Sequence, residues 1–238
     1  MIAQGLFRRG IRRPMSAPAW LPDWCRRVYL DYRRYRASDE SVLTTIFLTQ
    51  GFWASFVYRV SRATIDLLPP GPLQKLVRAF TLIAQKIIEI LTGILLPRQC
   101  DIGEGLLIGH FGGIIFPAEG KIGHNCNIGQ NVTIGTAGKG SARGAPTIGN
   151  RVFIGAHSVV VGKISIGDDA MICAGAVVTR PVPPRAVVMG NPAKVVSYDG
   201  SFDYVVYDGM ETDPDRRASL ECLVQNVRPQ TPPPAPPA

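Results

Sequence analysis

The chain has 238 residues, of which 46% are hydrophobic, enough for one globular core or two small ones. Its formal net charge of +8 favours anionic partners such as a phosphorylated cofactor or a lipid surface. Nucleic acid is excluded as a partner, because no platform of aromatic and basic residues and no base-reading motif accompanies the charge.

The cysteines and apolar segments bear on the cellular compartment. The five cysteines are widely spaced and form no CxxC pair, which predicts reduced thiols in a cytoplasmic protein. No secretory signal pattern is visible, and charged residues interrupt the long apolar stretch at 73–96, so a membrane span is not expected. The arginine-rich N-terminus and the apolar helices leave open peripheral contact with the inner face of the membrane.

The first two segments of the chain are expected to be basic and helical. Residues 1–40 form a basic, partly ordered segment with a short helix at 24–36, and residues 41–97 form a helical domain broken by the sequence LPPGP at 68–72. In its second half, apolar residues alternate in steps of four and three, which predicts a helical stripe in the core or at an interface. The stripe contains Leu76, Phe80, Ile83, Ile87, Ile90 and Ile94.

A six-residue period begins at residue 101 and defines the third segment, residues 98–196. An aliphatic residue followed by glycine occurs at Ile102, Ile108, Ile122, Ile128, Ile134, Ile148, Ile154 and Ile166. Where the period expects an aliphatic residue but this pair is absent, we assign Ile114, Val160 and Ile172. Two extra residues near 116–117 and a longer excursion at 136–147 interrupt the period. Three such hexads form one triangular coil of about 18 residues, and stacked coils align their aliphatic residues in ladders.

We therefore predict an α+β protein, with an N-terminal helical region followed by a parallel β-helix. The glycine after each aliphatic residue is expected at a tight corner, where a side chain would cost conformational energy. Residues 197–238 form a C-terminal extension that ends in a proline-rich tail. Its role is left open.

Four motifs resemble the hexapeptide-repeat acyltransferases, in particular their serine acetyltransferase-like branch. These motifs are GFWASFVYRVSR at 51–62, IGHFGGIIF at 108–116, VTIGTAGKG at 132–140 and VVTRPVPPRAVVMGNPAKVV at 177–196. The segment GHFGG resembles a subgroup associated with exopolysaccharide synthesis. The resemblance implies a left-handed β-helix that forms a homotrimer, with acetyl-CoA in a groove between neighbouring prisms.

The resemblance also implies a direct acetyl transfer with His110 as general base. A hydroxyl is a poor nucleophile at neutral pH, and an imidazole titrates near that pH. The resemblance places Gly135 and Thr136 beside the thioester and pantetheine arm. The remaining expected cofactor contacts are Ala156 and Ala174 along the arm and Lys194 near the nucleotide phosphates.

Departures from the serine acetyltransferase pattern bear on the acceptor. Gly109 and Leu95 stand where that branch carries two aspartates, the second of which orients the base. Gly144 and Ala145 replace the arginine and histidine that hold the amino acid, and Arg143 is the remaining candidate for a substrate contact. Because a zwitterion needs charged partners, the sequence favours a sugar or polysaccharide-precursor hydroxyl, with serine as the alternative.

Two alternatives belong to other functional classes. A non-catalytic trimeric scaffold is supported by Leu95, but a scaffold would not need the GHFGG, GTAGKG and GNPAK segments. A zinc site of three histidines, as in some related β-helices, is not expected, because the repeat places His110 and His124 on different faces and His157 in another phase. What orients His110, and whether trimers pair into hexamers, are left open.

Overall fold

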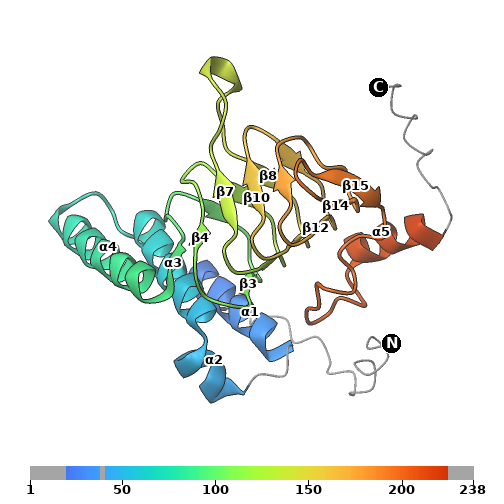
Figure 1. Ribbon diagram of the computed structural model, residues 1–238. Coiled ribbons are helices and arrows are strands. Elements are labelled where there is room, and N and C mark those ends of the chain that lie inside the picture. The colour runs from blue at the N-terminus through green and yellow to red at the C-terminus, as the bar shows by residue number, and fades with distance from the viewer. Residues whose placement is uncertain (1–19, 38–40, 225–238) are drawn as a thin grey trace.

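The computed structural model describes residues 20–37 and 41–224. It contains N-terminal helices, a left-handed β-helix of parallel strands and a C-terminal segment that ends in a helix (Figure 1). This confirms the predicted fold class. The expected basic segment before residue 20 and the proline-rich tail lie outside the described residues. In the described part of the chain, no helix is long and apolar enough to cross a membrane.

The N-terminal helices pack around α3. They are α1 (Asp23–Ala37), α2 (Val42–Leu48), α3 (Gln50–Leu67) and α4 (Pro72–Thr92). Helices α1 and α4 both contact α3, and α2 contacts α1 and α3. Helix α4 begins with Pro72 in its first turn and ends at Gly93, which has a left-handed φ of 69°. Ile94, which the sequence placed on the helical stripe, therefore belongs to the first strand.

Three parallel sheets form the faces of the prism. The face that begins at the first strand contains β1 (Ile94–Leu95), β4 (Ile114–Ile115), β7 (Thr133–Gly135), β10 (Val159–Val161) and β13 (Val177–Val178). The second face contains β2 (Asp101–Ile102), β5 (Lys121–Ile122), β8 (Thr147–Ile148) and β11 (Ser165–Ile166). The third contains β3 (Leu107–Ile108), β6 (Asn127–Ile128), β9 (Phe153–Ile154), β12 (Met171–Ile172), β14 (Val187–Met189) and the antiparallel β15 (Lys194–Ser197). We refer to these as the first, second and third faces.

The ladder on the first face corrects the position of the two extra residues. Ile115 pairs with Thr133, so the inward position that matches Ile134 is Phe116, and Ile114 matches Val132. The extra residues therefore lie between Ile108 and Ile114, at the corner that carries His110, and not near residues 116–117. The sequence assignment was wrong because Ile114 is also buried, and burial alone does not distinguish neighbouring inward positions.

The repeated glycines are required by close packing between coils. A Cβ on Gly129 would lie 2.6 Å from the Ala156 nitrogen, and one on Gly155 would lie 2.5 Å from the Ala174 nitrogen. Positive φ values occur later in the corner, at residues such as Asn131 (55°) and His157 (60°). The expected reason for the glycines was therefore wrong: a Cβ would collide with the next coil, whereas the left-handed backbone belongs to other residues.

Helices α1 and α3 cover the open end of the β-helix. The Tyr58 hydroxyl donates to the Cys100 carbonyl (2.8 Å) and accepts from the Ile102 amide (3.2 Å). The buried Arg59 guanidinium donates to the Ile102 carbonyl (2.6 Å) and forms an ion pair with Asp31 of α1 (2.8 Å). These side chains satisfy backbone groups that no further coil pairs, so the helices act as the terminal cap that a stacked-repeat fold needs.

The outer face of α4 rules out one half of the sequence-based expectation, which placed the stripe in the core or at an interface. The stripe residues on this helix are exposed, from 51% at Ile87 to 76% at Ile90, instead of lying in the core of the described chain. The side that packs against α3 buries polar residues, among them Gln74, Thr81 and Thr92. Their side chains donate to backbone carbonyls of Leu68, Arg78 and Ile88, which satisfies them without burial of the apolar stripe.

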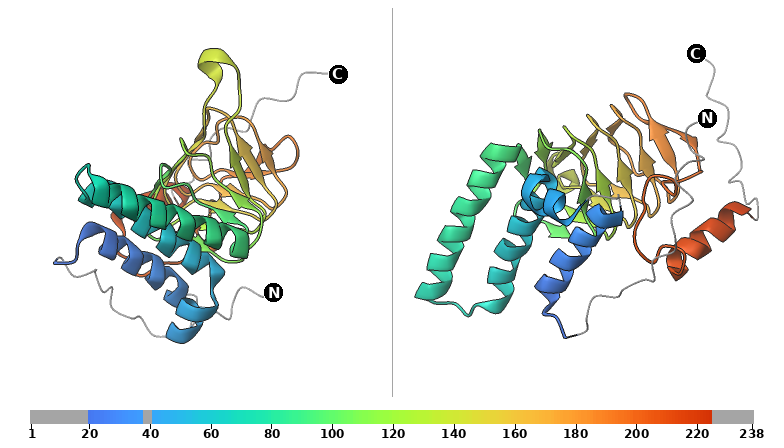
Figure 2. Two further views of the ribbon diagram at one scale, coloured as in Figure 1. Left: turned by 90° about the vertical axis from the view of Figure 1, so that its left-hand side faces the viewer. Right: turned by 90° about the horizontal axis from the view of Figure 1, so that it is seen from below.

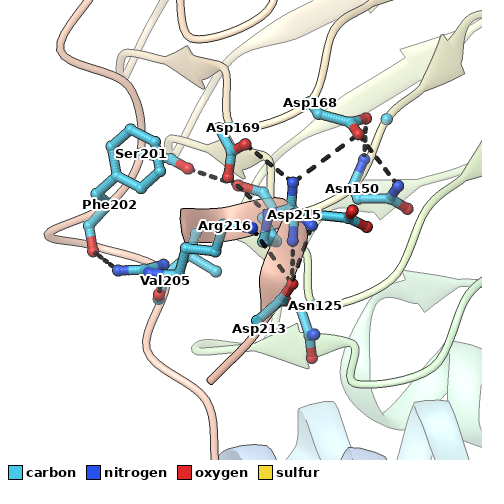
Figure 3. A network of polar contacts seen from close by, with 12 residues as sticks. Asn125, Asn150, Asp168, Asp169, Ser201, Phe202, Val205, Asp213, Asp215 and Arg216 are labelled. Carbon is cyan, nitrogen blue, oxygen red and sulfur yellow. Dashed lines mark hydrogen bonds and ion pairs between the residues drawn. The ribbon is translucent and has the colours of Figure 1, made fainter. Parts of the chain in front are cut away.

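The C-terminal segment 198–224 packs on the β-helix and ends in α5 (Pro214–Val224). Buried Arg151 binds Asp169 through Nε (2.7 Å) and lies 3.9 Å from Asp213 of this segment. Buried Arg216 donates to the carbonyls of Phe202 (2.8 Å) and Val205 (3.0 Å). Figure 3 shows Asp169 and Asp213 on opposite sides of this network. Sequence analysis left the role of this segment open, because contacts that anchor it, such as those with Arg151, join residues distant in sequence.

Candidate active site

His110 lies on an enlarged corner between the third and first faces. In the next coil, three residues separate Ile128 from Val132, whereas here five residues separate Ile108 from Ile114, which matches Val132. Gly112 (φ 102°) and Gly113 (φ 58°) permit the wider turn. The Gly112 amide donates to the Thr92 carbonyl (2.8 Å), which fixes the turn against the end of α4. The enlarged corner presents an exposed imidazole.

The repeat aligns His110 with Gln130 and two alanines in a column along this corner. Strand pairing matches β3, β6, β9 and β12, and the residue two positions after each inward isoleucine is His110, Gln130, Ala156 and Ala174 in turn. Beyond them, exposed Lys194 pairs with Met189 where β15 covers β14. Three of the predicted site residues thus share one edge of the prism, and Lys194 lies toward its C-terminal end.

The other predicted site residues lie at the opposite edge of the first face. Gly135 ends β7, and Thr136 begins the excursion toward β8. Residues 136–146 project from the prism as an arm, seen at the top of Figure 1. The arm is closed by reciprocal backbone hydrogen bonds between Ala137 and Gly144 (3.1 and 3.0 Å), and it carries exposed Arg143. Within one chain the structure does not bring Arg143 to the corner of His110.

Among the described residues, none hydrogen-bonds the imidazole of His110. Leu95 lies in β1 beside Ile115 and offers no polar atom. The next corner residues are Asn131 and His157, whose side-chain nitrogens are 3.5 Å apart. Sequence analysis did not select Gln130 or Asn131, although Gln130 shares the spacing of His110 after its isoleucine. A comparison of corner positions between coils would have found them.

The other groups considered for catalysis or metal binding either lie apart from one another or are unreactive. His124 lies at the corner between the second and third faces, where its Nδ1 is 3.2 Å from the Asn125 amide nitrogen. In the described part of the chain, no three side chains of His, Cys, Asp or Glu gather as metal ligands would. Burial raises the pKa of the Cys100 and Cys126 thiols to about 12, so neither supplies a thiolate nucleophile near neutral pH.

Models of known repeats match two parts of the β-helix. The model described as "Bacterial transferase hexapeptide (six repeats)" matches residues 145–180, and "Hexapeptide repeat of succinyl-transferase" matches residues 121–137. Together with the prism, these matches define the class of hexapeptide-repeat transferases.

Curated relatives narrow the class. A serine acetyltransferase of Mycobacterium tuberculosis is 37% identical over 149 residues, which cover 60% of this chain and 62% of the relative. A serine acetyltransferase of Helicobacter pylori is 34% identical over 157 residues, which cover 65% of this chain and 85% of the relative. The chain therefore belongs to the hexapeptide-repeat acyltransferase family, and these relatives are serine acetyltransferases.

Solved structures agree with this assignment. Soybean serine acetyltransferase complexed with serine superposes with a TM-score of 0.64 at 30% identity, covering 74% of this chain and 70% of that one. A serine acetyltransferase in complex with CoA gives a TM-score of 0.63 at 26% identity, with the same coverage. None of these relatives is a sugar O-acetyltransferase, so the likeness to that subgroup stays a prediction.

Proposed function

We propose that this protein transfers an acetyl group from acetyl-CoA to an acceptor hydroxyl, with His110 as the general base. The observation that carries the proposal is the enlarged corner, which exposes His110 in line with Ala156 and Ala174. The imidazole would accept the hydroxyl proton as the oxygen attacks the thioester carbonyl, and CoA would leave as the thiol. Membership in the acyltransferase family supports this reaction.

The cofactor contacts belong to the same proposal. The small side chains of Ala156 and Ala174 would let the pantetheine arm lie close to the backbone of the coils. Exposed Lys194, toward the far end of this edge, would offset the nucleotide phosphates. Gly135 and Thr136 lie on the far edge of the first face, so they would contact a cofactor held between this chain and a neighbour.

We propose a homotrimer for this reason. His110 and Arg143 lie at different edges of one prism, and only a neighbouring chain could bring such edges together. The outer side of the first face presents Ile115 at 46% exposure, beside half-buried Leu95 and two strands away from half-buried Val159. A neighbour packed on this face would bury these residues and complete the surroundings of His110.

The acceptor is proposed to be serine, the alternative that the sequence analysis placed second. The relatives support serine over the sugar hydroxyl that the missing charged residues favoured. A sugar acceptor remains the second candidate on a specific observation: Gly144 and Ala145 in the arm carry no charged group. Arg143 is the neighbouring guanidinium that could bind a carboxylate.

The deciding experiment follows thiol release from acetyl-CoA with L-serine, free hexoses and nucleotide sugars as separate acceptors. We expect turnover with serine, and a loss of about 10²–10⁴-fold in kcat for His110→Ala, the range for removal of a general base. His124→Ala is the matched control, because that histidine lies on another corner, and its rate should be unchanged.

The other outcomes discriminate between the candidates. Turnover with a sugar alone would replace serine by the carbohydrate acceptor. A rate that His110→Ala leaves intact would reject His110 as the base. Failure of every acceptor, together with no CoA binding in a titration, would favour the non-catalytic scaffold.

A further inference from the structure

The outer surface of the helices carries apolar side chains that the described chain leaves uncovered. Along α4 they form one stripe with more than half of each side chain exposed, which we call the α4 stripe: Leu73, Leu76, Phe80, Ile83, Ile87, Ile90 and Leu91. With 21 residues, α4 extends the stripe over about 30 Å. Helix α2 adds further exposed apolar residues, including Leu43 (69%) and Phe47 (63%). A surface of this length is larger than scattered exposed residues would produce.

An apolar groove lies between the N-terminal helices and includes Ile88 of α4. It has a volume of about 800 Å³ and is lined by all four N-terminal helices, with Ile46 from α2, Phe56 from α3 and Ile88 from α4. Ile46 and Phe56 are themselves partly exposed, at 42% and 43%. Figure 2 shows α4 and α1 on the same side of the molecule, away from the far end of the β-helix. The α4 stripe, the exposed residues of α2 and this groove together form what we call the apolar face.

The packing of α4 explains why this face points outward. Gln74, Thr81 and Thr92 occupy the inner side of the helix with their hydrogen-bonding groups satisfied. A rotation of α4 that buried the stripe would expose this polar side and break the bond from Gln74 to the Leu68 carbonyl, whereas the bonds of Thr81 and Thr92 lie within α4. The exposed stripe is thus the arrangement that the sequence of α4 favours in the presence of α3.

The charge distribution indicates what covers the face. Residues 20–37 and 41–99, which contain the four helices, carry eleven Lys and Arg against four Asp and Glu, whereas residues 100–224 carry ten against twelve. Exposed Lys75 and Lys86 lie beside the stripe on α4, whose single acidic residue is Glu89, the partner of Lys86 at 2.7 Å. A second copy would bring an equally cationic surface against this one, whereas an anionic lipid surface would complement it.

We propose that the apolar face binds the surface of an anionic membrane, with α4 in the plane of the interface. The leucine, isoleucine and phenylalanine side chains of the stripe would enter the boundary between headgroups and acyl chains, while Lys75 and Lys86 contact lipid phosphates. The inner side of α4 stays packed on α3, so the helix lies on the membrane without crossing it. This proposal does not depend on acetyl transfer.

The test is flotation of the full chain with vesicles of phosphatidylcholine alone and of phosphatidylcholine mixed with phosphatidylglycerol. We expect the protein to float with the mixed vesicles only. The double variant Phe80→Ser/Ile87→Ser should reduce the bound fraction by about tenfold or more, because two anchoring side chains are lost. Lys75→Glu/Lys86→Glu should weaken binding to the mixed vesicles by a similar factor, about tenfold.

A matched control separates the face from general surface hydrophobicity. Val206 is 43% exposed on the C-terminal segment, so Val206→Ser should bind as the unchanged chain does. All the substituted side chains are exposed, and circular dichroism should show unchanged folding. If the α4 variants still bind the vesicles, binding would be due to the arginines at positions 8–13, and the proposal would be wrong.

Absence of flotation with either vesicle would also overturn it. Light scattering would then compare the unchanged chain with the Phe80→Ser/Ile87→Ser variant. If the unchanged chain formed a particle of twice the mass of the variant particle, the apolar face would be a contact between copies of the assembly. Equal particle masses for the two proteins would leave the apolar face without a role in membrane binding or in contact between copies.

Discussion

At the scale of single residues, the glycines of the hexads differ in what surrounds them. Gly129 follows an inward isoleucine and faces the next coil, where an added Cβ would lie 2.6 Å from the Ala156 nitrogen. Gly109 occupies the same place in the preceding coil, but no atom lies within 4 Å of its Cβ position. The two extra residues of the His110 corner remove the neighbour that the other coils have. Position 109 can therefore accept a side chain, such as the aspartate that the serine acetyltransferase pattern carries there.

This difference predicts opposite results for two equivalent substitutions. Gly129→Ala should lower the free energy of unfolding by about 1–3 kcal/mol, because the backbone of the next coil must move. Gly109→Ala should change it by less than about 0.5 kcal/mol. Urea denaturation of both variants checks the prediction. Equal losses of unfolding free energy in the two variants would show that glycine is needed at both positions for its backbone conformation, as expected from the sequence.

At the scale of elements, a buried ion pair contributes to the connection between the helices and the β-helix. Asp31 of α1 accepts from Arg59 of α3 (2.8 and 3.1 Å) and from the Leu106 amide at the start of the third face (2.9 Å). Two helices and the first coil thus share one carboxylate. The sequence places both charges in amphipathic helices but does not show that they meet.

Removal of this carboxylate should be costly. We expect Asp31→Ala to lower the free energy of unfolding by about 3–5 kcal/mol, since it leaves the Arg59 charge buried without its partner. Arg27→Ala is the matched control, because Arg27 pairs with Asp23 on the exposed side of α1. It should cost at most about 1 kcal/mol, as exposed pairs do. Chemical denaturation of both variants measures the contrast, and a small loss for Asp31→Ala would mean that the helices do not depend on this pair.

The C-terminal segment should respond to acid. Burial by itself would raise the pKa of the Asp213 carboxyl, but the Tyr207 hydroxyl, the Arg216 amide and the charge of Arg151 outweigh it and hold the pKa below the ordinary value of 3.8. A lowered folded-state pKa stabilises the packed segment above about pH 4, and the contribution is lost as the pH falls through the folded-state pKa.

We therefore expect residues 198–224 to exchange amide hydrogens faster at pH 3 than at pH 6, relative to the strands of the β-helix. Asp213→Asn removes the titrating group, so it should exchange faster at pH 6 and show a smaller change on acidification. Mass spectrometry of hydrogen exchange provides the measurement. A segment whose relative exchange is insensitive to acid would show that the Arg216 contacts alone hold it.

At the scale of the whole molecule, one prism does not complete the proposed site. His110 stands without a hydrogen-bond partner among the described residues, and the arm with Arg143 projects from the other edge of the first face. The proposed homotrimer predicts a particle of three times 25.8 kDa, or a multiple of it, by light scattering in solution. Ile115→Glu would place a charge on the outer first face and should reduce the particle to single chains. A monomeric wild-type chain that still releases CoA would contradict the requirement for a neighbour.

The sequence by itself determined the β-helix, because each hexad carries its own local signal: an inward aliphatic residue and a glycine that the next coil approaches. It also predicted His110 as the base, since a histidine in this corner motif is recognised from the residues next to it in the chain. Tertiary structure decided the rest. Pairing of Ile115 with Thr133 moved the two extra residues to the His110 corner, because register depends on the neighbouring strand. Packing of α4 on α3 left the apolar side of α4 facing outward, and charged residues distant in sequence docked the C-terminal segment. These outcomes depend on which surfaces meet, and a local pattern does not contain that information.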